Sequence, residues 1–464
     1  MDKDKRIESD SIGTMEVPLN AYYGVQTLRA VENFQITGHR IHSVFIKNLV
    51  LVKKAAAITN MKTKSISEET GNAIIQACDE ILTGKFADEF VVDAIQGGAG
   101  TSSNMNVNEV IANRATEILG GKKGEYIVHP NDHVNKEQST NDVVPTAGKL
   151  SVMDLLKDLI KEIEHLQAAL RKKEKEFHNI IKMGRTQLQD AVPMRLGQSF
   201  GGYAAMLNKD LYRLKEAHKE MIWVNLGGTA IGTGINTSRE YFENIVPELC
   251  KVTGYSELHQ ADDLFDSTEN LDGFVAVSGA IKTCAMNLSK MCSDLRLLSS
   301  GPRTGIGEIN LPPRQNGSSI MPGKINPVIP EVVNQVAFLI VGHDATIAMA
   351  AEAGQLELNA FEPVLFYTLF ESITSLTGAV NTLTKNCIEG ITANKENCTA
   401  HLEQSIGIVT ALCPIIGYQK SAEIAKKALK TGKTIRQLVL EEKIMSAEEC
   451  DKILDPSSMT GYLR

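Results

Sequence analysis

The sequence predicts a mainly α-helical protein built around a bundle of long helices. Its 464 residues are rich in alanine, leucine, isoleucine, methionine and glutamate, which favour helices. Apolar residues recur at helical spacing over five long stretches, and no convincing series of strands is evident. A chain of this length is too large for a single hydrophobic core, so we expect two or three domains.

Residues 1–140 are expected to form a mixed, mainly helical N-terminal domain. Short helical patterns alternate there with glycine loops, of which Gln96–Gly100 is the clearest. Beyond Ile391 the helical patterns become short again, so residues 392–464 are expected to form a small C-terminal helical domain. Residues 141–391 are the predicted central bundle domain.

The central bundle is predicted first from residues 148–183, whose apolar pattern is far longer than an average globular helix. Five long helices joined by glycine-containing loops indicate a bundle. Two segments, 275–292 and 332–354, lack a clear polar face. Because one bundle per chain cannot bury them all, we expect chains to associate through the bundle faces. The other predicted long helices are 198–225, 273–299, 327–353 and 361–388.

Composition and charge exclude several classes of protein. Hydrophobic residues make up 43% of the chain and charged residues 22%, which is ordinary for a folded soluble protein. The net charge is −8, and the densest basic cluster, Arg171–Lys175, lies in a helical pattern, so nucleic acid is not an expected partner. The eight cysteines form no C-x-x-C pair, which suits a reducing compartment. The charged N-terminus does not resemble a signal peptide, and no uninterrupted apolar run is long enough to span a bilayer. We therefore expect a cytoplasmic protein.

The segment GSSIMPGKINP, Gly317–Pro327, first suggests a phosphate-binding loop. Such a loop has four residues between its glycines and a serine or threonine after the lysine. Here five residues separate Gly317 from Gly323, and Ile325 follows Lys324, so the magnesium-nucleotide interpretation fails. What remains is a flexible loop with two hydroxyls, a cation and an amide, which alone is most simply a surface turn.

Three other segments combine glycine or proline with many hydroxyl and amide side chains: residues 97–110, 129–147 and 184–198. In the first, Thr101–Ser103 precede an amphipathic pattern, where helix capping is the simplest role. In the third, Thr186 and Gln187 lie in a break between two long helices that Pro193 fixes.

The second of these segments places Ser139–Asp142 just before a long helix. It also contains His129, Asp132 and His133, residue types that bind metals. No pattern of a third ligand accompanies them, so capping and hydrogen bonding are favoured and no metal site is predicted.

Together, the four segments place neutral hydrogen-bond donors at helix ends, with one fixed cation at Lys324. Helix N-termini add partial positive charge and free N–H groups. This combination suits a small polyanionic substrate, especially one on which charge grows on an oxygen during the reaction.

The motifs GSSIMPGKINP, TSSNMNVNEV and HPNDHVNKEQSTND resemble those of the aspartase/fumarase superfamily. The resemblance covers essentially the whole chain, from AYYGVQTLRAVENF at Ala21 to SIGIVTALCPIIG near the C-terminus. It implies three mainly helical domains whose five-helix bundles assemble into the twenty-helix core of a homotetramer. It also implies active sites that each draw on three subunits.

Several positions resemble the aspartate ammonia-lyase branch more than the class II fumarase branch. Tyr22–Thr27, Gln96–Thr101 and Asn326–Glu331 match the former. Gln187 stands where fumarases carry a histidine, although some aspartases keep that histidine. Hydroxide is a poor leaving group that needs a proton donor, whereas an ammonium group leaves without one, so a neutral amide suits aspartate. Gln187 can also merely satisfy a buried backbone group.

The resemblance implies reversible elimination of ammonia from L-aspartate to give fumarate. It makes Ser318 the base that removes a proton from the carbon next to the β-carboxylate, through an aci-carboxylate intermediate. No cofactor is expected, although a divalent metal such as magnesium can activate some family members. Class II fumarase activity and a non-catalytic structural protein on the same scaffold are the alternatives. The implied substrate contacts are Thr101, Ser139, Thr140 and Ser319 to the β-carboxylate, Asn141 and Gln187 to the amino group, and Thr186, Lys324 and Asn326 to the α-carboxylate.

Overall fold

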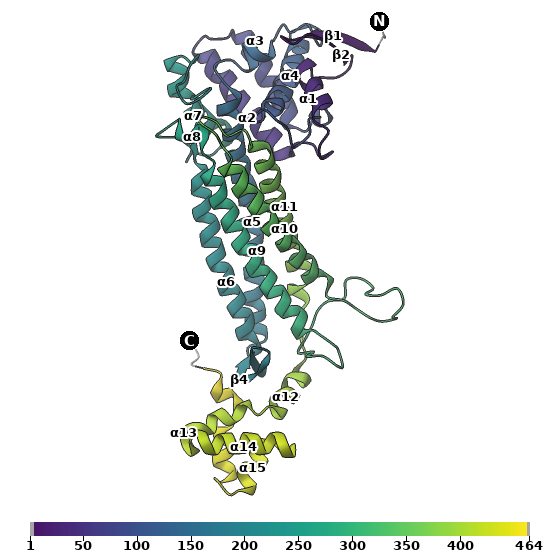
Figure 1. Cartoon of the computed structure of the whole chain (residues 1–464), viewed down its shortest axis with the longest axis vertical. Coiled ribbons are helices and arrows are strands. Elements are labelled where there is room, and N and C mark those ends of the chain that lie inside the picture. Colours follow the sequence, from purple (N-terminus) through teal and green to yellow (C-terminus); the bar gives the residue numbers. More distant parts are fainter. Residues whose placement is uncertain (1–3, 462–464) are drawn as a thin grey trace. The chain divides into compact units, whose positions relative to one another are not determined.

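The computed structural model describes residues 4–461, and their fold is mainly helical, as predicted (Figure 1). The helices are α1 Val25–Asn33, α2 Ser43–Lys62, α3 Glu68–Leu82, α4 Thr101–Ile118, α5 Thr140–Glu176, α6 Leu196–His218, α7 Arg239–Thr253, α8 Asp266–Glu269, α9 Asp272–Leu298, α10 Val328–Glu352, α11 Glu362–Asn386, α12 Lys395–Gln404, α13 Cys413–Ile416, α14 Tyr418–Thr431, α15 Ile435–Glu441 and α16 Ala447–Ile453. The strands are β1 Lys5–Ser9, β2 Thr14–Pro18, β3 Ile181–Thr186, β4 Gln189–Arg195, β5 Trp223–Val224, β6 His259–Gln260, β7 Ile309–Asn310 and β8 Thr392–Ala393.

The chain forms two compact units. Unit 1 contains the chain up to Ile160 together with Tyr212–Thr283 and Phe338–Leu376. Unit 2 contains Lys161–Leu211, Cys284–Ala337 and the chain from Thr377 onward. This division cuts through the long helices, so it differs from the predicted domain boundaries at residues 140 and 391, which stay a prediction.

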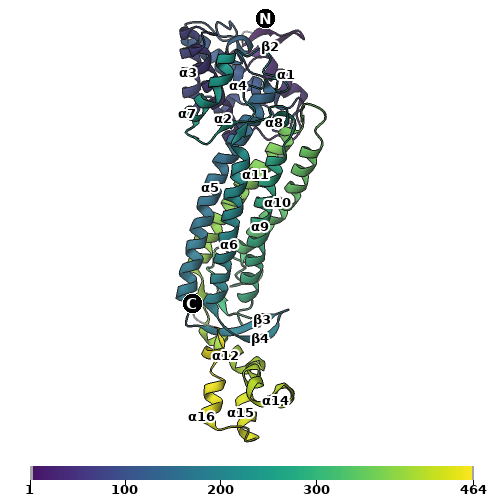
Figure 2. The ribbon, with the colours of Figure 1, turned by 90° about the vertical axis from the view of Figure 1, so that its left-hand side faces the viewer.

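The five predicted long helices are confirmed as α5, α6, α9, α10 and α11, and segments of all five lie side by side within each unit (Figures 1 and 2). The bounds predicted for the first of them were wrong. It begins at Thr140, ahead of Pro145, and ends at Glu176. Ile181 belongs to strand β3 instead, and its apolar side chain matches the helical spacing only by coincidence.

The strands form four two-stranded sheets, which the sequence did not predict. In unit 2, β3 and β4 form an antiparallel hairpin with a two-residue turn, since Thr186 pairs with Gln189 (Figure 2). The hairpin is the predicted break between two long helices, α5 and α6, and Pro193 lies within β4. The other pairs are β1 with β2, β5 with β6, and β7 with β8.

Helix α10 is long and apolar, but Glu331, Asn334 and Asp344 interrupt it, so it does not contradict the expectation that no uninterrupted apolar run spans a bilayer. By length and composition it is the one helix among residues 4–461 that is long and apolar enough to cross a membrane, and 28% of its most apolar 18-residue window is buried. The core helix of a soluble protein passes the same test. Large apolar side chains on α10 stand exposed in the single chain, including Phe338 at 68% and Met349 at 73%. An unpartnered apolar helix face agrees with the predicted association of chains, which stays a prediction.

In unit 1 the segment Tyr22–Thr27 is fixed to α4 by one buried carboxylate. Glu109 Oε2 accepts hydrogen bonds from the backbone N–H of Gly24 at 2.8 Å and from the Thr27 hydroxyl at 2.6 Å, and Oε1 accepts from the Gln26 N–H at 2.9 Å. These N–H groups open helix α1, where a negative charge is favourable. A Cβ atom at Gly24 would lie 2.3 Å from the Tyr126 hydroxyl oxygen, so only glycine fits.

The helices that follow α12 have a small hydrophobic core of their own in unit 2. It is formed by side chains of the α14, α15 and α16 region, and partly buried residues pack around it. The fully or nearly fully buried members are Leu412, Ile424, Ala428, Ile435, Leu438, Val439, Cys450 and Leu454. A separate core is what a small C-terminal domain requires.

Candidate active site

The first predicted site residue, Thr101, opens helix α4 after a tight left-handed turn. Gly98, Ala99 and Gly100 have φ values of 96°, 52° and 80°. The Thr101 hydroxyl donates to the Gly98 carbonyl at 2.7 Å and its side chain is exposed. Helix capping by Thr101–Ser103 is wrong: the Gln96 side-chain carbonyl instead accepts the Ser103 N–H at 2.9 Å. The Thr101 hydroxyl is therefore not used to cap the helix.

The second group lies at the N-terminus of helix α5, also in unit 1. Ser139 Oγ accepts the Asn141 N–H at 3.3 Å, and Thr140 Oγ1 accepts a hydrogen bond from Asn104 Nδ2 at 3.3 Å. A hydroxyl oxygen that accepts a hydrogen bond keeps its own hydrogen free to donate. Both hydroxyls are therefore ready to donate to an anion in front of the helix N-terminus.

Asn141 is oriented by the loop that follows β5. Its Nδ2 donates to the Ala230 carbonyl at 2.7 Å, which leaves Oδ1 as the acceptor of that amide. Pro145 has no N–H to bond the Asn141 carbonyl in the helix, and Asn225 Nδ2 supplies that hydrogen bond at 3.0 Å. The proline therefore ties the first turn of α5 to the loop.

A buried polar network lies behind this group, and sequence reasoning missed it. The ammonium of Lys53, with no solvent exposure, donates to Asn135 Oδ1 at 2.8 Å and to Gln138 Oε1 at 3.0 Å. Asn135 Oδ1 also accepts from Asn104 Nδ2 at 3.2 Å, and Asn104 is the residue that bonds Thr140. Burial lowers the pKa of Lys53 to about 7, while the nearby Asp142 carboxylate opposes that shift.

Asp142 lies behind Ser139, Thr140 and Asn141 in the first turn of α5 and links them to the loop after β5. Its carboxylate accepts the N–H groups of Ser139 at 2.9 Å, Gly227 at 2.9 Å and Thr229 at 3.2 Å. Burial raises the pKa of Asp142 despite these hydrogen bonds and the positive charge of Lys53. The density of asparagines in residues 104–141 was the only sequence signal for this network.

The third group, Thr186 and Gln187, lies at the exposed tip of the β3–β4 hairpin in unit 2. Gln187 and Leu188 form the turn and both have positive φ values, 53° and 61°. Two-residue hairpins prefer this geometry, but asparagine and glycine adopt it more readily than glutamine and leucine. Gln187 is exposed in the single chain.

The fourth group lies in the loop between β7 and α10, also in unit 2. Ser318 Oγ accepts the N–H groups of Ile320 at 3.2 Å and Met321 at 3.0 Å. The base of the loop is closed by the Gly317 N–H, which donates to the Lys324 carbonyl at 2.8 Å, and by Asn326 Nδ2, which donates to the Gly317 carbonyl at 2.7 Å. Lys324 is exposed, and within residues 4–461 its ammonium forms no ion pair.

The single chain brings some predicted site residues together but not all. Ser139, Thr140 and Asn141 share one helix end in unit 1, and Asn104, one turn into α4 from Thr101, contacts Thr140. The other predicted residues belong to unit 2. In the described part of unit 2, no hydrogen bond or ion pair joins the Thr186–Gln187 turn to the residues of the Ser318 loop.

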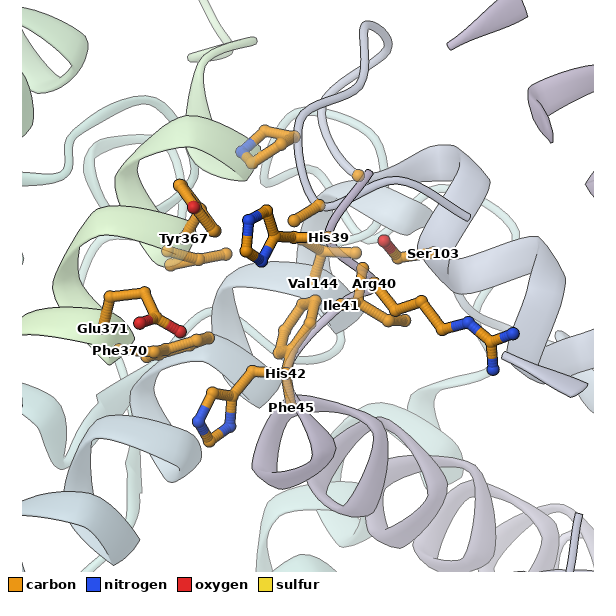
Figure 3. Close-up of a pocket in the computed structure, with 14 residues that line it drawn as sticks. His39, Arg40, Ile41, His42, Phe45, Ser103, Val144, Tyr367, Phe370 and Glu371 are labelled. Atoms are coloured by element: carbon orange, nitrogen blue, oxygen red, sulfur yellow. The ribbon is translucent and has the colours of Figure 1, made fainter. Parts of the chain in front are cut away.

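A well-formed cavity of about 90 Å³ in unit 1 contains none of the predicted site residues (Figure 3). It lies between α4, α5 and α11, and its wall is formed largely by rings, including His39, Phe45, Tyr367 and Phe370. Burial lowers the pKa of His42 at its edge. Ser103 and Tyr367 bring two hydroxyls to the cavity, but most of its wall is apolar or aromatic and it holds none of the predicted contacts, so it is not proposed as the substrate site.

Among residues 4–461, no group of three histidine, cysteine, aspartate or glutamate side chains is placed to bind a metal. His129 serves as a cap, because its Nδ1 accepts the N–H groups of Asn131 and Asp132, both at 3.2 Å. His133 Nδ1 accepts the N–H of His129 at 2.8 Å. Capping and hydrogen bonding were the roles favoured from the sequence.

Comparison with known proteins identifies the family. The family model described as lyase matches residues 13–342, and the model of the fumarase C C-terminus matches residues 408–461. An aspartate ammonia-lyase of Helicobacter pylori is 54% identical over 457 residues, which are 98% of this chain and 97% of that protein.

Solved structures agree with this match. The structure described as fumarate lyase:delta crystallin from Brucella melitensis bound to cobalt has a TM-score of 0.95 and 49% identity, covering 99% of this chain and all of that one. Class II fumarase from Schistosoma mansoni has a TM-score of 0.94 and 36% identity, covering 98% of this chain and 99% of that one. The chain therefore belongs to the aspartase/fumarase superfamily of lyases and is most similar, among these, to its aspartate ammonia-lyases.

Proposed function

We propose that this protein catalyses the reversible elimination of ammonia from L-aspartate to give fumarate. The observation that carries the proposal is the 54% identity to an aspartate ammonia-lyase over almost the entire chain, against 36% to a class II fumarase. The polar helix ends and the exposed lysine of the candidate site suit a small dicarboxylate. The enzyme is a carbon–nitrogen lyase.

Ser318 is the proposed base that removes the proton from Cβ. A serine hydroxyl is a poor base unless its ionised form is stabilised. The N–H groups of Ile320 and Met321 already donate to Ser318 Oγ, and hydrogen bonds to a charged form favour that form. The same two bonds also define a common serine turn, so they support the role without being specific to it.

The β-carboxylate becomes doubly negative when the proton leaves Cβ, and neutral donors are proposed to stabilise it. The hydroxyls of Ser139 and Thr140 are oriented to donate, and Thr101 and Ser319 would add two more. Each well-placed donor of this kind contributes roughly 3 kcal/mol. The Thr101 hydroxyl has to exchange its bond to the Gly98 carbonyl for the substrate.

The substrate's other two groups are proposed to bind the remaining residues. The free acceptor of Asn141, Oδ1, suits the ammonium group, and so does the side-chain carbonyl of Gln187. Thr186, Lys324 and Asn326 are proposed to hold the α-carboxylate. The ammonium leaves without a further proton, so no acid is required at Gln187.

We infer that these groups meet in a homotetramer whose active sites each draw on three subunits. The exposed apolar face of α10 supports association, because helix faces of this kind are normally covered. A cytoplasmic location and a reaction that needs no cofactor are part of the proposal. Activation by a divalent metal such as magnesium is compatible with it, and the Brucella melitensis relative is described as bound to cobalt.

The proposal is tested by incubating the purified protein with L-aspartate or with L-malate and following fumarate by its ultraviolet absorbance. We expect fumarate from aspartate and little from malate. Ser318→Ala should lower kcat by about 10²–10⁴-fold with an unchanged circular dichroism spectrum. Turnover of malate alone would make the protein a class II fumarase, and no turnover of either would favour a structural protein.

A further inference from the structure

Glu308 is a fully buried acidic residue of unit 2 that forms ion pairs. It is not one of the proposed substrate contacts. Its carboxylate has no solvent exposure. Oε2 lies 2.9 Å from the Lys182 ammonium, and Oε1 lies 2.9 Å from Arg185 Nη2. His401 Nδ1, on α12, is 3.2 Å from the same Oε1. Three side chains from two elements therefore converge on one carboxylate.

Lys182 and Arg185 contact the same carboxylate from positions three residues apart on strand β3, beside an irregularity of the hairpin. In a regular strand, residues three apart point to opposite faces. The pairing of β3 with β4 shifts by one residue here, and the extra residue is on β4, where Ala191 and Val192 together lie opposite Gly184. A bulge twists the hairpin locally, and the long Arg185 side chain reaches Glu308 Oε1 at 2.9 Å. A Cβ atom at Gly184 would lie 2.8 Å from the Val192 carbonyl oxygen, so glycine is required there.

Thr186 and Gln187 follow directly after Arg185, which with Lys182 forms ion pairs to Glu308. Both side chains are exposed at the tip, and the turn has the positive φ values of 53° and 61°. A tip of this kind has little packing of its own in the single chain. Its position is therefore set by how the strand below it is held, and the strand is held through Arg185, the residue before Thr186.

Glu308 is itself fixed to the scaffold through its backbone. Its N–H donates to the Leu298 carbonyl at the end of α9, and its carbonyl accepts the Asn394 N–H, both at 2.9 Å. Strand β7 starts at the next residue and leads toward the Ser318 loop. The carboxylate thus joins the hairpin tip to the segment that continues into the proposed base.

The charges around Glu308 keep it ionised. Burial alone would raise the pKa of its carboxyl group, but the hydrogen bond from Arg185 and the charge of Lys182 outweigh burial and lower it. A neutral amide at this position would leave the buried Lys182 and the partly buried Arg185 without a counter-charge. The interaction is therefore specific for a carboxylate.

We propose that Glu308 is a positioning residue that holds Thr186 and Gln187 in place for the substrate's α-carboxylate and ammonium groups. This inference rests on the proposed function, since the two tip residues are assigned to the substrate there. Glu308 acts through Lys182 and Arg185 and does not touch the substrate. A misplacement of about 1 Å at a substrate contact can cost about 100-fold in rate.

A double-mutant cycle tests the proposal in the full-length protein. The kcat/KM for L-aspartate is measured for the wild type, Glu308→Gln, Gln187→Ala and the double variant. We expect Glu308→Gln to lower kcat/KM by about 10–100-fold. In the Gln187→Ala background the same change should cost at least about fivefold less, because the contact that it positions is already absent.

Asp210→Asn is the matched control, because Asp210 is a buried carboxylate of the same unit that accepts hydrogen bonds from Asn287 at 2.8 and 3.0 Å. We expect its kcat/KM to stay within about twofold of the wild type. Equal losses in the two Glu308→Gln backgrounds, or a loss no larger than that of Asp210→Asn, would overturn the proposal. A wild type inactive on aspartate would instead refute the proposed function.

If Glu308→Gln fails to fold, substitutions of its partner Arg185 test the proposal instead. Replacement of Arg185 leaves Glu308 paired with Lys182, so no buried charge is left without a partner. We expect Arg185→Gln to lower kcat/KM and to show the same coupling to Gln187→Ala, with Arg185→Lys restoring part of the activity. No coupling with either variant would overturn the proposal.

Discussion

Two fully buried charged groups lie behind the candidate substrate residues, and their surroundings are opposite in kind. In unit 1, the Lys53 ammonium is held by the neutral amide carbonyls of Asn135 and Gln138. In unit 2, the Glu308 carboxylate is held by the cations of Lys182 and Arg185. Burial shifts the pKa of Lys53 down to about 7, whereas ion pairing keeps that of Glu308 below its ordinary value.

The difference shows two ways in which buried groups can orient the side chains of a polar site. The amide network around Lys53 orients neutral donors such as Thr140 and leaves the charge of the lysine sensitive to its surroundings. The ion pairs around Glu308 fix the charge itself, and with it the strand that carries the hairpin tip. The first arrangement should respond to pH near neutrality, and the second should respond to the loss of one partner.

The largest effect is expected from Glu308→Ala, which leaves the buried Lys182 and the partly buried Arg185 without their counter-charge. Removal of one partner from a buried ion pair typically costs about 3–5 kcal/mol of stability. Urea unfolding at fixed protein concentration measures the loss. A loss below about 1 kcal/mol would mean that solvent reaches the two cations and that the two regions do not differ as described.

A smaller effect is expected from Lys53→Met, seen as a change in the pH dependence of stability. Between its folded pKa of about 7 and its ordinary value of 10.5, Lys53 is protonated in the unfolded chain and largely neutral in the folded one. Stability should therefore rise with pH across this window, by up to about 1.4 kcal/mol per pH unit from this group. Unfolding of both proteins at pH 7 and pH 9 measures the difference in slope.

Equal slopes for Lys53→Met and the wild type would contradict that prediction. The Glu308 group serves as the internal contrast, since its folded pKa is lowered. Its contribution is present above the ordinary carboxyl pKa and is lost as the pH falls through the folded value, so it should not affect the window between pH 7 and pH 9.

The smallest effect is expected at the hairpin turn. Leu188 is 69% exposed and has a φ of 61°, a conformation that asparagine adopts more readily than leucine. Leu188→Asn should stabilise the protein by a few tenths to about 1 kcal/mol, measured as a rise in Tm. Val192→Asn, at an exposed apolar position in extended backbone of β4, is the control and should not stabilise. A lower Tm for Leu188→Asn would show that Leu188 makes contacts in the assembled protein.

The long helices could be predicted from the sequence because their apolar spacing is sustained over many turns. The β3–β4 hairpin could not, since Gly184 and Pro193 look like breaks between helices and the bulge disrupts the alternation of a strand. The start of α5 at Thr140 was also missed, because the apolar pattern was followed only from residue 148 and Pro145 lies inside the helix. In the structure Asn225 replaces the missing hydrogen bond.

The hydroxyls and amides of the candidate site were predicted from their density at helix ends, together with the resemblance to the superfamily. The residues behind them were not. Lys53 and Lys54 are neighbours with the same side chain, yet Lys53 is fully buried while Lys54 is partly exposed and pairs with Asp79. Likewise Glu308 looks like an ordinary loop residue. Three-dimensional convergence decides these roles, and no local pattern records it.

The bulge opposite Gly184 makes the length of the hairpin a determinant of what its tip presents. One residue inserted between Lys182 and Thr186 would remove the irregularity and one deleted would double it, and either would turn the following side chains to the opposite face of the ribbon. The helices would be untouched, but the tip would offer a different set of groups. Relatives that differ by a single residue in this segment should therefore differ in the amines or acids that they accept, even where every tip residue is the same.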